Sequence, residues 1–274
     1  MTRYAVDGNE FICPGEVLKP NFWRAPTDND YGAKFQRKLR VWHRPTMDLL
    51  SIGSATTPDS VVVSATYDMP DVKACLHLEY VVGRSGEVRV TQRLATDTTA
   101  RVAGMFRFGM QLPMPKNYNQ VAYYGRGPVE NYSNRCGAAK LGIWQQTVDE
   151  QYHPYVRPQE TGTKTDIRWW RLTDVRGVGL EFTAASPFSA SALHYRQEQL
   201  DEGVDKNKAQ GHGEIIPQAD LTNFSIDLVQ MGQACIDSWS AQPLPQFQVP
   251  YKDYSFSFIM RPCRTFYESS RWGR

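Results

Sequence analysis

The sequence predicts an all-β fold in which two stacked antiparallel sheets form a single domain, residues 1–274. The first observation is a series of short runs in which apolar and polar residues alternate, as they do along a half-buried strand. The second is the regular spacing of Gly, Pro and Asp turns between these runs. The third is a single helical period, which predicts one short helix near residues 33–42 with Phe35, Leu39 and Trp42 on its apolar face. No internal repeat or change in composition divides the chain.

Residues 2–20 are predicted to form short strands, and the next segment, residues 21–32, is predicted to form a shaped loop. This loop places many turn-forming residues between an aromatic Phe-Trp pair and the predicted helix. From its local sequence alone, we interpret the loop as an Asx-turn and helix N-cap, in which a side chain accepts hydrogen bonds from the first backbone N–H groups. The candidates for this role are Asp28, Asn29 and Asp30, and Gly32 ends the turn. Contact of the loop with a ligand is left open at this point.

The clearest strand covers residues 72–82, where apolar side chains fill one face and polar side chains the other. The turn at residues 83–86 leads into the next strand, residues 88–94, and completes a hairpin. Further strands are expected at residues 60–67, 104–112, 120–125, 164–174, 178–183, 188–195, 224–231 and 254–260. Residues 201–220 are polar and rich in glycine, so we expect a mobile loop there.

Charge and cysteine content exclude several classes of function. The net charge is only +2, with 31 basic and 29 acidic residues, so neither nucleic acid nor a membrane is expected as a partner. No apolar stretch is long enough for a membrane span, and no secretory signal is present. Five scattered cysteines without a C-x-x-C pair argue against a disulfide framework and a zinc site. Because residues 1–3 run directly into a strand pattern, we interpret the chain as a fragment of a longer multidomain protein, and the compartment, cytoplasm or periplasm, stays open.

The stretch 123–162 contains two carboxylates, Glu130 and Glu160, that could form the acid pair of a glycoside hydrolase. The alternative is that they form structural ion pairs, which are the commoner fate of such groups. The nearby arginines are Arg126, Arg135 and Arg157. No histidine pair has metal-ligand spacing and no G-x-S-x-G motif occurs. We therefore predict neither a catalytic residue nor a metal site in this chain.

Residues 233–240 place Trp239 between small polar residues, just before a proline-rich loop. A tryptophan on a loop offers a flat apolar surface for the C–H face of a sugar and an N–H donor. The alternative is a tryptophan that closes one end of the sandwich. The local sequence does not decide between these two roles.

Taken together, four motifs point to a known family. They are Phe-Trp-Arg-Ala-Pro-Thr-Asp-Asn-Asp-Tyr-Gly at 22–32, Gly-Arg-Gly-Pro-Val-Glu-Asn-Tyr at 125–132, Tyr-His-Pro-Tyr-Val-Arg-Pro-Gln-Glu at 152–160 and Asp-Ser-Trp-Ser at 237–240. In this order they resemble the C-terminal small-chain domain, domain 5, of large bacterial β-galactosidases of glycoside hydrolase family 2. The resemblance covers essentially the whole chain. It implies an antiparallel β-supersandwich related to galactose mutarotases.

The resemblance also implies which parts of the parent enzyme carry the catalytic residues and the metal ions. The parent would hydrolyse terminal non-reducing β-D-galactose residues with a retaining mechanism, using two glutamates of a catalytic TIM-barrel domain of the same chain. Magnesium and sodium would bind in that barrel, so no cofactor is expected in this chain. The parent is expected to be a homo-oligomer, and this chain alone is expected to be inactive as a hydrolase.

Specific residues follow from the matching motifs. Trp239 would stack on the substrate around the aglycone subsite, with Asp237 beside it. An active-site loop would contain Asp28, Asn29, Asp30 and Gly32. One departure concerns residues 233–237, where this chain has Gln-Ala-Cys-Ile-Asp and the family's best-known member has a Gly-Gly-Asp-Asp run before the tryptophan. Substrate preference at that subsite therefore stays open.

Two other functions stay open from sequence. A free-standing mutarotase or epimerase would need His153 or His194 near a carboxylate such as Glu160. A lectin-like module would bind galactose without the rest of an enzyme.

Overall fold

The computed structural model describes residues 1–205, 216–233 and 241–264. Within these residues the strands are β1 (Ala5–Val6), β2 (Asn9–Glu10), β3 (Lys19–Asn21), β4 (Asp48–Thr56), β5 (Ser60–Met69), β6 (Ala74–Gly83), β7 (Val88–Thr96), β8 (Arg107–Met114), β9 (Gln120–Gly127), β10 (Lys140–Thr147), β11 (Lys164–Thr173), β12 (Val178–Leu193), β13 (Thr222–Gln230) and β14 (Tyr254–Arg264). The short helices are α1 (Asp28–Gly32), α2 (Phe35–Lys38) and α3 (Gln197–Leu200), with 3-10 turns η1 (Arg40–Trp42), η2 (Pro70–Val72), η3 (Asp149–Gln151) and η4 (Pro245–Phe247).

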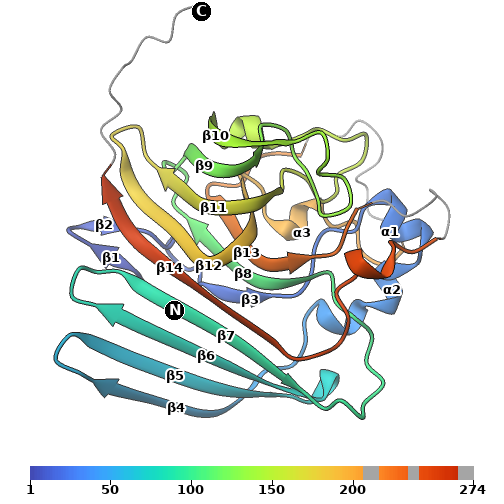
Figure 1. The fold of residues 1–274 in the computed structure, drawn as a ribbon, viewed down its shortest axis with the longest axis horizontal. Helices are drawn as coiled ribbons and strands as arrows, with labels where there is room; N and C mark the ends of the chain where they lie inside the picture. The colour runs from blue at the N-terminus through green and yellow to red at the C-terminus, as the bar shows by residue number, and fades with distance from the viewer. Residues whose placement is uncertain (206–215, 234–240, 265–274) are drawn as a thin grey trace, which may run out of the picture.

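The strands form one curled antiparallel sheet of twelve strands and a separate hairpin, β1–β2 (Figure 1). The main path runs β10-β9-β11-β12-β14-β7-β6-β5-β4, while β13 joins β12 to β8 and β3 pairs with β8. The 16-residue strand β12 makes this curl possible, because residues 178–184 pair with β14 and residues 189–193 pair with β13. The predicted antiparallel all-β fold is confirmed, and its two layers belong to one hydrogen-bonded sheet.

The core lies between the two layers and is rich in aromatic side chains. Phe108 of β8 stacks on Tyr254 of β14, with ring centroids 5.1 Å apart. The ring centroid of Phe224 on β13 lies 4.2 Å from that of Phe182 on β12 and 5.8 Å from that of Trp170 on β11. Aromatic pairs of this kind add to the area that each ring buries, so they stabilise the contact between strands that are distant in sequence.

The strand predictions are largely confirmed, with two informative differences. The alternation in β6 appears as expected, since Ala74, Leu76 and Leu78 are buried and His77 is exposed. The two strands expected at the start and end of β12 are one continuous strand. Strands β4 and β10 were not expected. Both are edge strands with one neighbour, and all nine residues of β4 are exposed, so no alternation of apolar and polar residues marks it.

The helix expected near residues 33–42 is present as the short helix α2, which is followed by the 3-10 turn η1 and preceded by a separate helix, α1. Lys34 separates α1 from α2, because its φ of 62° is left-handed and cannot continue a right-handed helix. The N-cap residue of α1 also differs from the three candidates that the sequence suggested. Thr27 is the N-cap, and its hydroxyl accepts from the N–H of Asp30 at 3.2 Å, while the Asp30 carboxylate accepts from the N–H of Thr27 at 2.9 Å. This reciprocal pair is a capping box.

The segment 201–220, expected to be a mobile loop, is anchored at its first residues. Asp201 and Glu202 are buried, and the Asp201 carboxylate accepts a 2.9 Å hydrogen bond from the indole of Trp23. The expectation is therefore wrong for this part, because buried carboxylates need partners. Asp201 finds Trp23 in the loop of residues 21–32, which we call the aromatic loop, and Glu202 pairs with Arg157. Residues 206–215 lie outside the described residues.

Across the described ranges, no helix has the length and apolar character that a membrane crossing would require.

Candidate functional site

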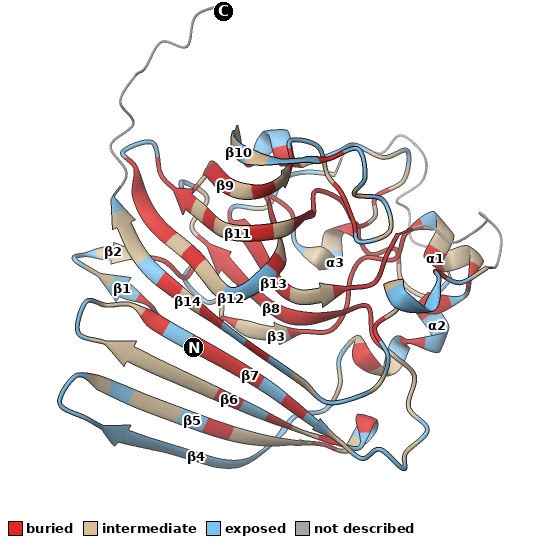
Figure 2. Cartoon of the chain, viewed as in Figure 1, coloured by how far each residue is buried: buried red, intermediate tan, exposed pale blue. Residues whose placement is uncertain are grey.

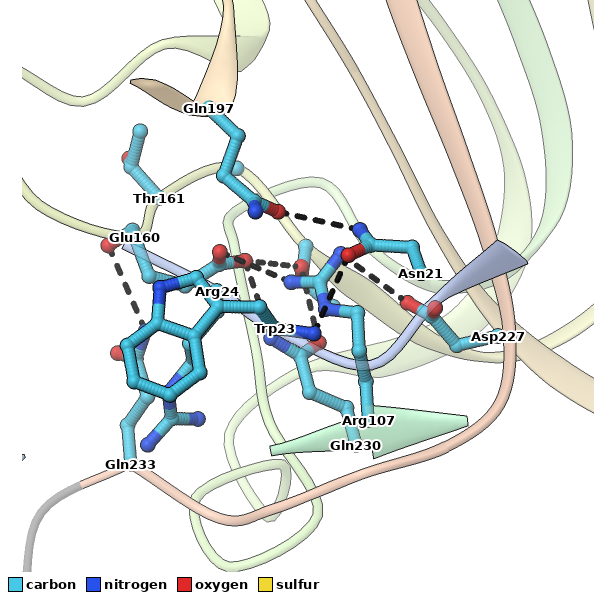
Figure 3. Close-up of polar contacts among 12 residues, drawn as sticks. Asn21, Trp23, Arg24, Arg107, Glu160, Thr161, Gln197, Asp227, Gln230 and Gln233 are labelled. Carbon is cyan, nitrogen blue, oxygen red and sulfur yellow. Dashed lines mark hydrogen bonds and ion pairs between the residues drawn. The ribbon is translucent and has the colours of Figure 1, made fainter. Parts of the chain in front are cut away.

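Three of the four sequence motifs meet in a network of buried and half-buried polar side chains, which we call the motif junction. Figure 3 shows three of its residues, Arg24, Glu160 and Gln233. The junction consists of Arg24, Asp30, Glu130, Glu160 and Gln233. The first two come from the aromatic loop and α1, and Glu130 comes from the segment after β9. Glu160 precedes β11, and Gln233 follows β13 and is the last described residue before position 241.

Arg24 joins the aromatic loop to the end of β13. Its side chain is fully buried and makes two parallel hydrogen bonds to the carboxylate of Asp30, at 3.0 and 2.8 Å. The same guanidinium donates to the carbonyl oxygens of Met231 at 2.6 Å and Gly232 at 3.2 Å. Because the capping box orients Asp30 toward Arg24, the start of α1 and the chain just before residues 234–240 are held together.

The backbone N–H and both carboxylate oxygens of Glu160 form hydrogen bonds within the protein. Its backbone N–H donates to the carbonyl of Ala25 at 3.1 Å, which ties it to the aromatic loop. One carboxylate oxygen accepts from the guanidinium of Arg107 at 2.9 Å. The other accepts from Thr163 at 3.0 Å and from Gln230 at 3.1 Å. A carboxylate held on both oxygens inside the protein serves structure rather than proton transfer to a substrate.

Glu130 is also held on both oxygens. One oxygen accepts from the Thr161 hydroxyl at 2.9 Å and from the Gly162 N–H at 2.8 Å, and the other from the side chains of Arg135 and Tyr155. Burial by itself would raise the pKa of Glu130, but the hydrogen bonds from Tyr155 and Gly162 outweigh it and lower the pKa. A general acid needs a raised pKa, so Glu130 has the opposite of the required property.

The ion-pair interpretation of the two carboxylates is therefore supported over the catalytic one. Arg135 pairs with Glu130, as the sequence suggested. Glu160 instead pairs with Arg107, which β8 supplies from more than fifty positions away. The other two arginines bind different carboxylates: Arg126 pairs with Asp166 and Arg157 with Glu202.

Among the described residues, His153 and His194 do not form the pair with Glu160 that a mutarotase would need. His194 is buried, and its Nδ1 lies 3.0 Å from the carbonyl oxygen of Leu221. His153 is exposed, with its ring 4.5 Å from that of Tyr155. Within the described ranges, neither imidazole makes a hydrogen bond or ion pair with Glu160.

Behind the junction lies a small polar cavity of about 20 Å³. Arg107 reaches it from β8 and pairs with Asp227 of β13 at 3.4 Å in addition to Glu160. Burial raises the pKa of Asp227 to about 7, although the Arg107 charge opposes this rise. Among the described residues, Arg107 Nε, Asp227 Oδ1 and Asn223 Oδ1 are buried without a hydrogen-bond partner. The volume suits about one water molecule and excludes a sugar ring.

Sequence reasoning missed the residues that organise this interior. Arg107 and Asp227 each stand inside an apolar run, and a single charge in such a run is a signal of a buried ion pair. Lys164 is also buried, and its ammonium donates to Gln151 and to the carbonyl of Gly162, both at 2.9 Å. Burial lowers the pKa of Lys164 to about 7, and the Glu130 charge acts in the opposite direction.

The predicted site residues fall into two groups. Asp28 is exposed, Asn29 and Gly32 are half-buried, and Asp30 is buried, all within α1. The amide of Gln159 donates to the Asp28 carboxylate at 3.2 Å, which adds a contact between the first and third motifs.

Asp237 and Trp239 lie outside the described residues. The last described residue before them, Gln233, donates to the carbonyl of Glu160 at 3.4 Å and accepts from Arg135 at 3.0 Å. The segment that contains both residues therefore starts at the motif junction.

Metal ligands are not grouped in the part of the chain that the structure describes. No cluster of three or more His, Cys, Asp or Glu side chains there could hold a metal ion.

Comparison with protein families and curated proteins gives consistent results. The family described as beta galactosidase small chain matches residues 1–260. A β-galactosidase from Priestia megaterium is 30% identical over 262 residues, which cover 94% of this chain and 24% of the relative. A β-galactosidase from Lactobacillus delbrueckii subsp. bulgaricus is 36% identical over 235 residues, which cover 82% of this chain and 22% of the relative. The chain thus spans about a quarter of the length of these relatives.

Solved structures with a similar arrangement include an aldose epimerase homologue from C. elegans, which is 10% identical with a TM-score of 0.43. That alignment covers 97% of this chain and 79% of the other. A putative aldose 1-epimerase from Escherichia coli K12 is 11% identical with a TM-score of 0.39, and covers 96% and 79%. Structural similarity at this level does not support a statement about function. From the family match over residues 1–260, the chain belongs to the beta-galactosidase small-chain family.

Proposed function

We propose that this chain is the small-chain domain of a longer β-galactosidase of glycoside hydrolase family 2, which hydrolyses terminal non-reducing β-D-galactose residues. The observation that carries the proposal is the convergence of the motifs at the motif junction. Arg24 and Gln233 bond the aromatic loop and the third motif to the chain just before residues 234–240. The names of the curated relatives and their greater length support the same conclusion.

In this proposal the domain completes the mouth of an active site that lies mostly in other parts of the protein. Trp239 contributes a flat apolar surface against the C–H face of the sugar, at the subsite of the aglycone. Asp237 contributes an acceptor for a sugar hydroxyl group. The active-site loop consists of Asp28, Asn29, Asp30 and Gly32. Such residues bind and orient the substrate, and they do not transfer protons to or from it.

The two catalytic carboxylates belong to a TIM barrel elsewhere in the parent, together with its magnesium and sodium ions. Retaining hydrolysis needs two carboxyl groups about 5 Å apart that both face the substrate. Glu130 and Glu160 are instead occupied by internal hydrogen bonds. The partners of this chain are therefore a galactoside and the barrel domain, and the parent assembles as a homo-oligomer.

The test is the substitution Trp239→Ala in the full-length polypeptide, with Trp239→Phe as the matched control. We expect KM for an aryl galactoside to rise about tenfold or more with alanine, because loss of a stacking surface removes at least ~1.4 kcal/mol of binding. Phenylalanine should retain most of the affinity. The covalent galactosyl-enzyme should still form in both variants. Unchanged affinity and turnover in Trp239→Ala would show that the assigned role is wrong.

Two assays on the 274-residue chain test the alternative functions. Polarimetry with α-galactose should show no acceleration of mutarotation, since in the described part of the chain neither His153 nor His194 bonds to Glu160. Calorimetric titration with galactose should show weak or no binding, because most of the sugar contacts would lie in the rest of the enzyme. Rapid mutarotation would support an epimerase, and tight galactose binding would support a lectin-like module.

A further inference from the structure

Near β4 and β5, the described residues cover one face of the curled sheet incompletely. Strands β4, β5 and β6 extend beyond the N-terminal segment that contains β1–β3 (Figure 1), and β4 is exposed along its whole length (Figure 2). We call the side of these strands that carries Ile52, Val63, Tyr80 and Val82 the open face. These residues line the same cavity, and strand pairing places Val63 opposite Tyr80 and Val61 opposite Val82.

The open face is one wall of an apolar groove of about 670 Å³. The opposite wall is formed by residues near the N-terminus, which include Met1 and Leu18. The two basic side chains in this wall are already paired, Arg3 with Glu10 and Lys19 with Glu198. An apolar occupant therefore fits the groove better than an anionic ligand.

Exposed apolar side chains are concentrated beside this groove. Five of the eleven large exposed hydrophobic residues in the described part of the chain lie between positions 47 and 61: Met47, Leu49, Leu50, Ile52 and Val61. Three of them belong to β4, which among the described strands pairs only with β5 and so presents a backbone edge that no other described strand covers. A long apolar edge of this kind is normally covered, because it otherwise promotes association with another strand.

We propose that the open face is covered by the remainder of the β-galactosidase polypeptide, which packs an apolar segment into the groove and against the β4 edge. The inference rests on the proposed function, under which this chain is joined to a polypeptide about four times its length, since it covers 22–24% of its relatives. Addition of a strand to β4 would satisfy its free edge, and apolar side chains would fill the groove.

The test uses the full-length polypeptide with Ile52→Glu and the matched control Ile143→Glu. Both isoleucines lie on edge strands of the same sheet, and they are 66% and 67% exposed in the isolated domain. We expect Ile52→Glu to lower the midpoint of thermal inactivation by about 3–6 °C relative to the control, a shift that fits the loss of one buried apolar contact. In the unsubstituted protein, amide exchange in β4–β6 should be at least about tenfold slower in the full-length polypeptide than in the 274-residue chain.

The outcomes separate the two proposals. If the full-length polypeptide has no β-galactosidase activity, the proposed function is wrong, while the exchange measurement still decides whether the groove is covered. If activity is present but β4–β6 exchange at equal rates in both proteins, or the two glutamate variants behave alike, the inference about the groove is wrong. A concentration-dependent dimer of the 274-residue chain that Ile52→Glu dissociates would assign the open face to a second copy and overturn the proposal.

Discussion

The motif junction and the open face belong to the same sheet but differ in how completely the chain itself covers them. In the junction, charged groups such as Arg24 and Asp30 are buried, and side chains or backbone carbonyls of this chain serve as their partners. On the open face, apolar side chains such as Ile52 remain exposed beside an unpaired strand edge. The described charges of the junction therefore find their partners within this chain, whereas the apolar side chains of the open face are those that the proposed cover would bury.

The two regions should also differ in how much free energy of unfolding a substitution costs. Removing one partner from the junction leaves a charge buried without compensation, which costs far more than the pair contributes. Changing a side chain on the open face removes little, because water already reaches it. Substitutions in the two regions should therefore differ strongly in the isolated chain.

The largest effect is expected for Arg24→Ala. The substitution leaves the buried carboxylate of Asp30 without its ion pair and frees the carbonyl oxygens of Met231 and Gly232. We expect a loss of about 3–5 kcal/mol in the free energy of unfolding, measured by urea denaturation.

The control is Arg37→Ala, which removes an arginine of α2 that pairs with Asp205 at the surface, where the two side chains are 60% and 55% exposed. Its expected cost is below about 1 kcal/mol. Similar losses for Arg24→Ala and Arg37→Ala would contradict the view that the junction depends on burial of its charges.

A smaller effect is expected for Lys164→Met, and it depends on pH. Burial lowers the pKa of Lys164 from 10.5 to about 7, so above pH 7 the unfolded chain holds a proton that the folded chain has lost. The Lys164 contribution to stability should therefore rise with pH through this range and be least favourable below it. Relative to the methionine variant, the wild type should gain about 2–3 kcal/mol between about pH 7 and pH 9.

Denaturation of both proteins at several pH values measures this gain. Lys140→Met is the control, because Lys140 is exposed on β10 and remains hydrated in the folded state. A constant difference in stability between wild type and Lys164→Met across the range would show that the buried amine does not titrate there.

The smallest effect on stability is expected for Ile52→Lys in the 274-residue chain. Because Ile52 is 66% exposed, its replacement should change the free energy of unfolding by less than about 0.5 kcal/mol. The same change should raise the solubility of the chain, since a charge on an edge strand blocks association of strands. Static light scattering at increasing concentration measures this effect, and a large loss of stability would place Ile52 in the core instead.

Much of the fold was predictable from local patterns. The alternation in residues 72–82 predicted β6 because one side of this strand faces the core and the other faces solvent. Strand β4 gave no such signal, because both of its sides are exposed in this chain. The division between α2 and η1 was also not predictable, since Phe35, Leu39 and Trp42 keep a helical spacing although α2 ends at Lys38 and a separate 3-10 turn begins at Arg40.

For the site, the sequence by itself determined the four motifs and, through them, the family to which the chain belongs. Only the tertiary structure decided how the motifs meet. Arg107 reaches Glu160, and Arg24 reaches Met231 and Gly232, across separations of 53 to 208 positions. The physical reason is that motifs record which side chains are present, whereas the partner of a buried charge is set by strand pairing and by the curl of the sheet.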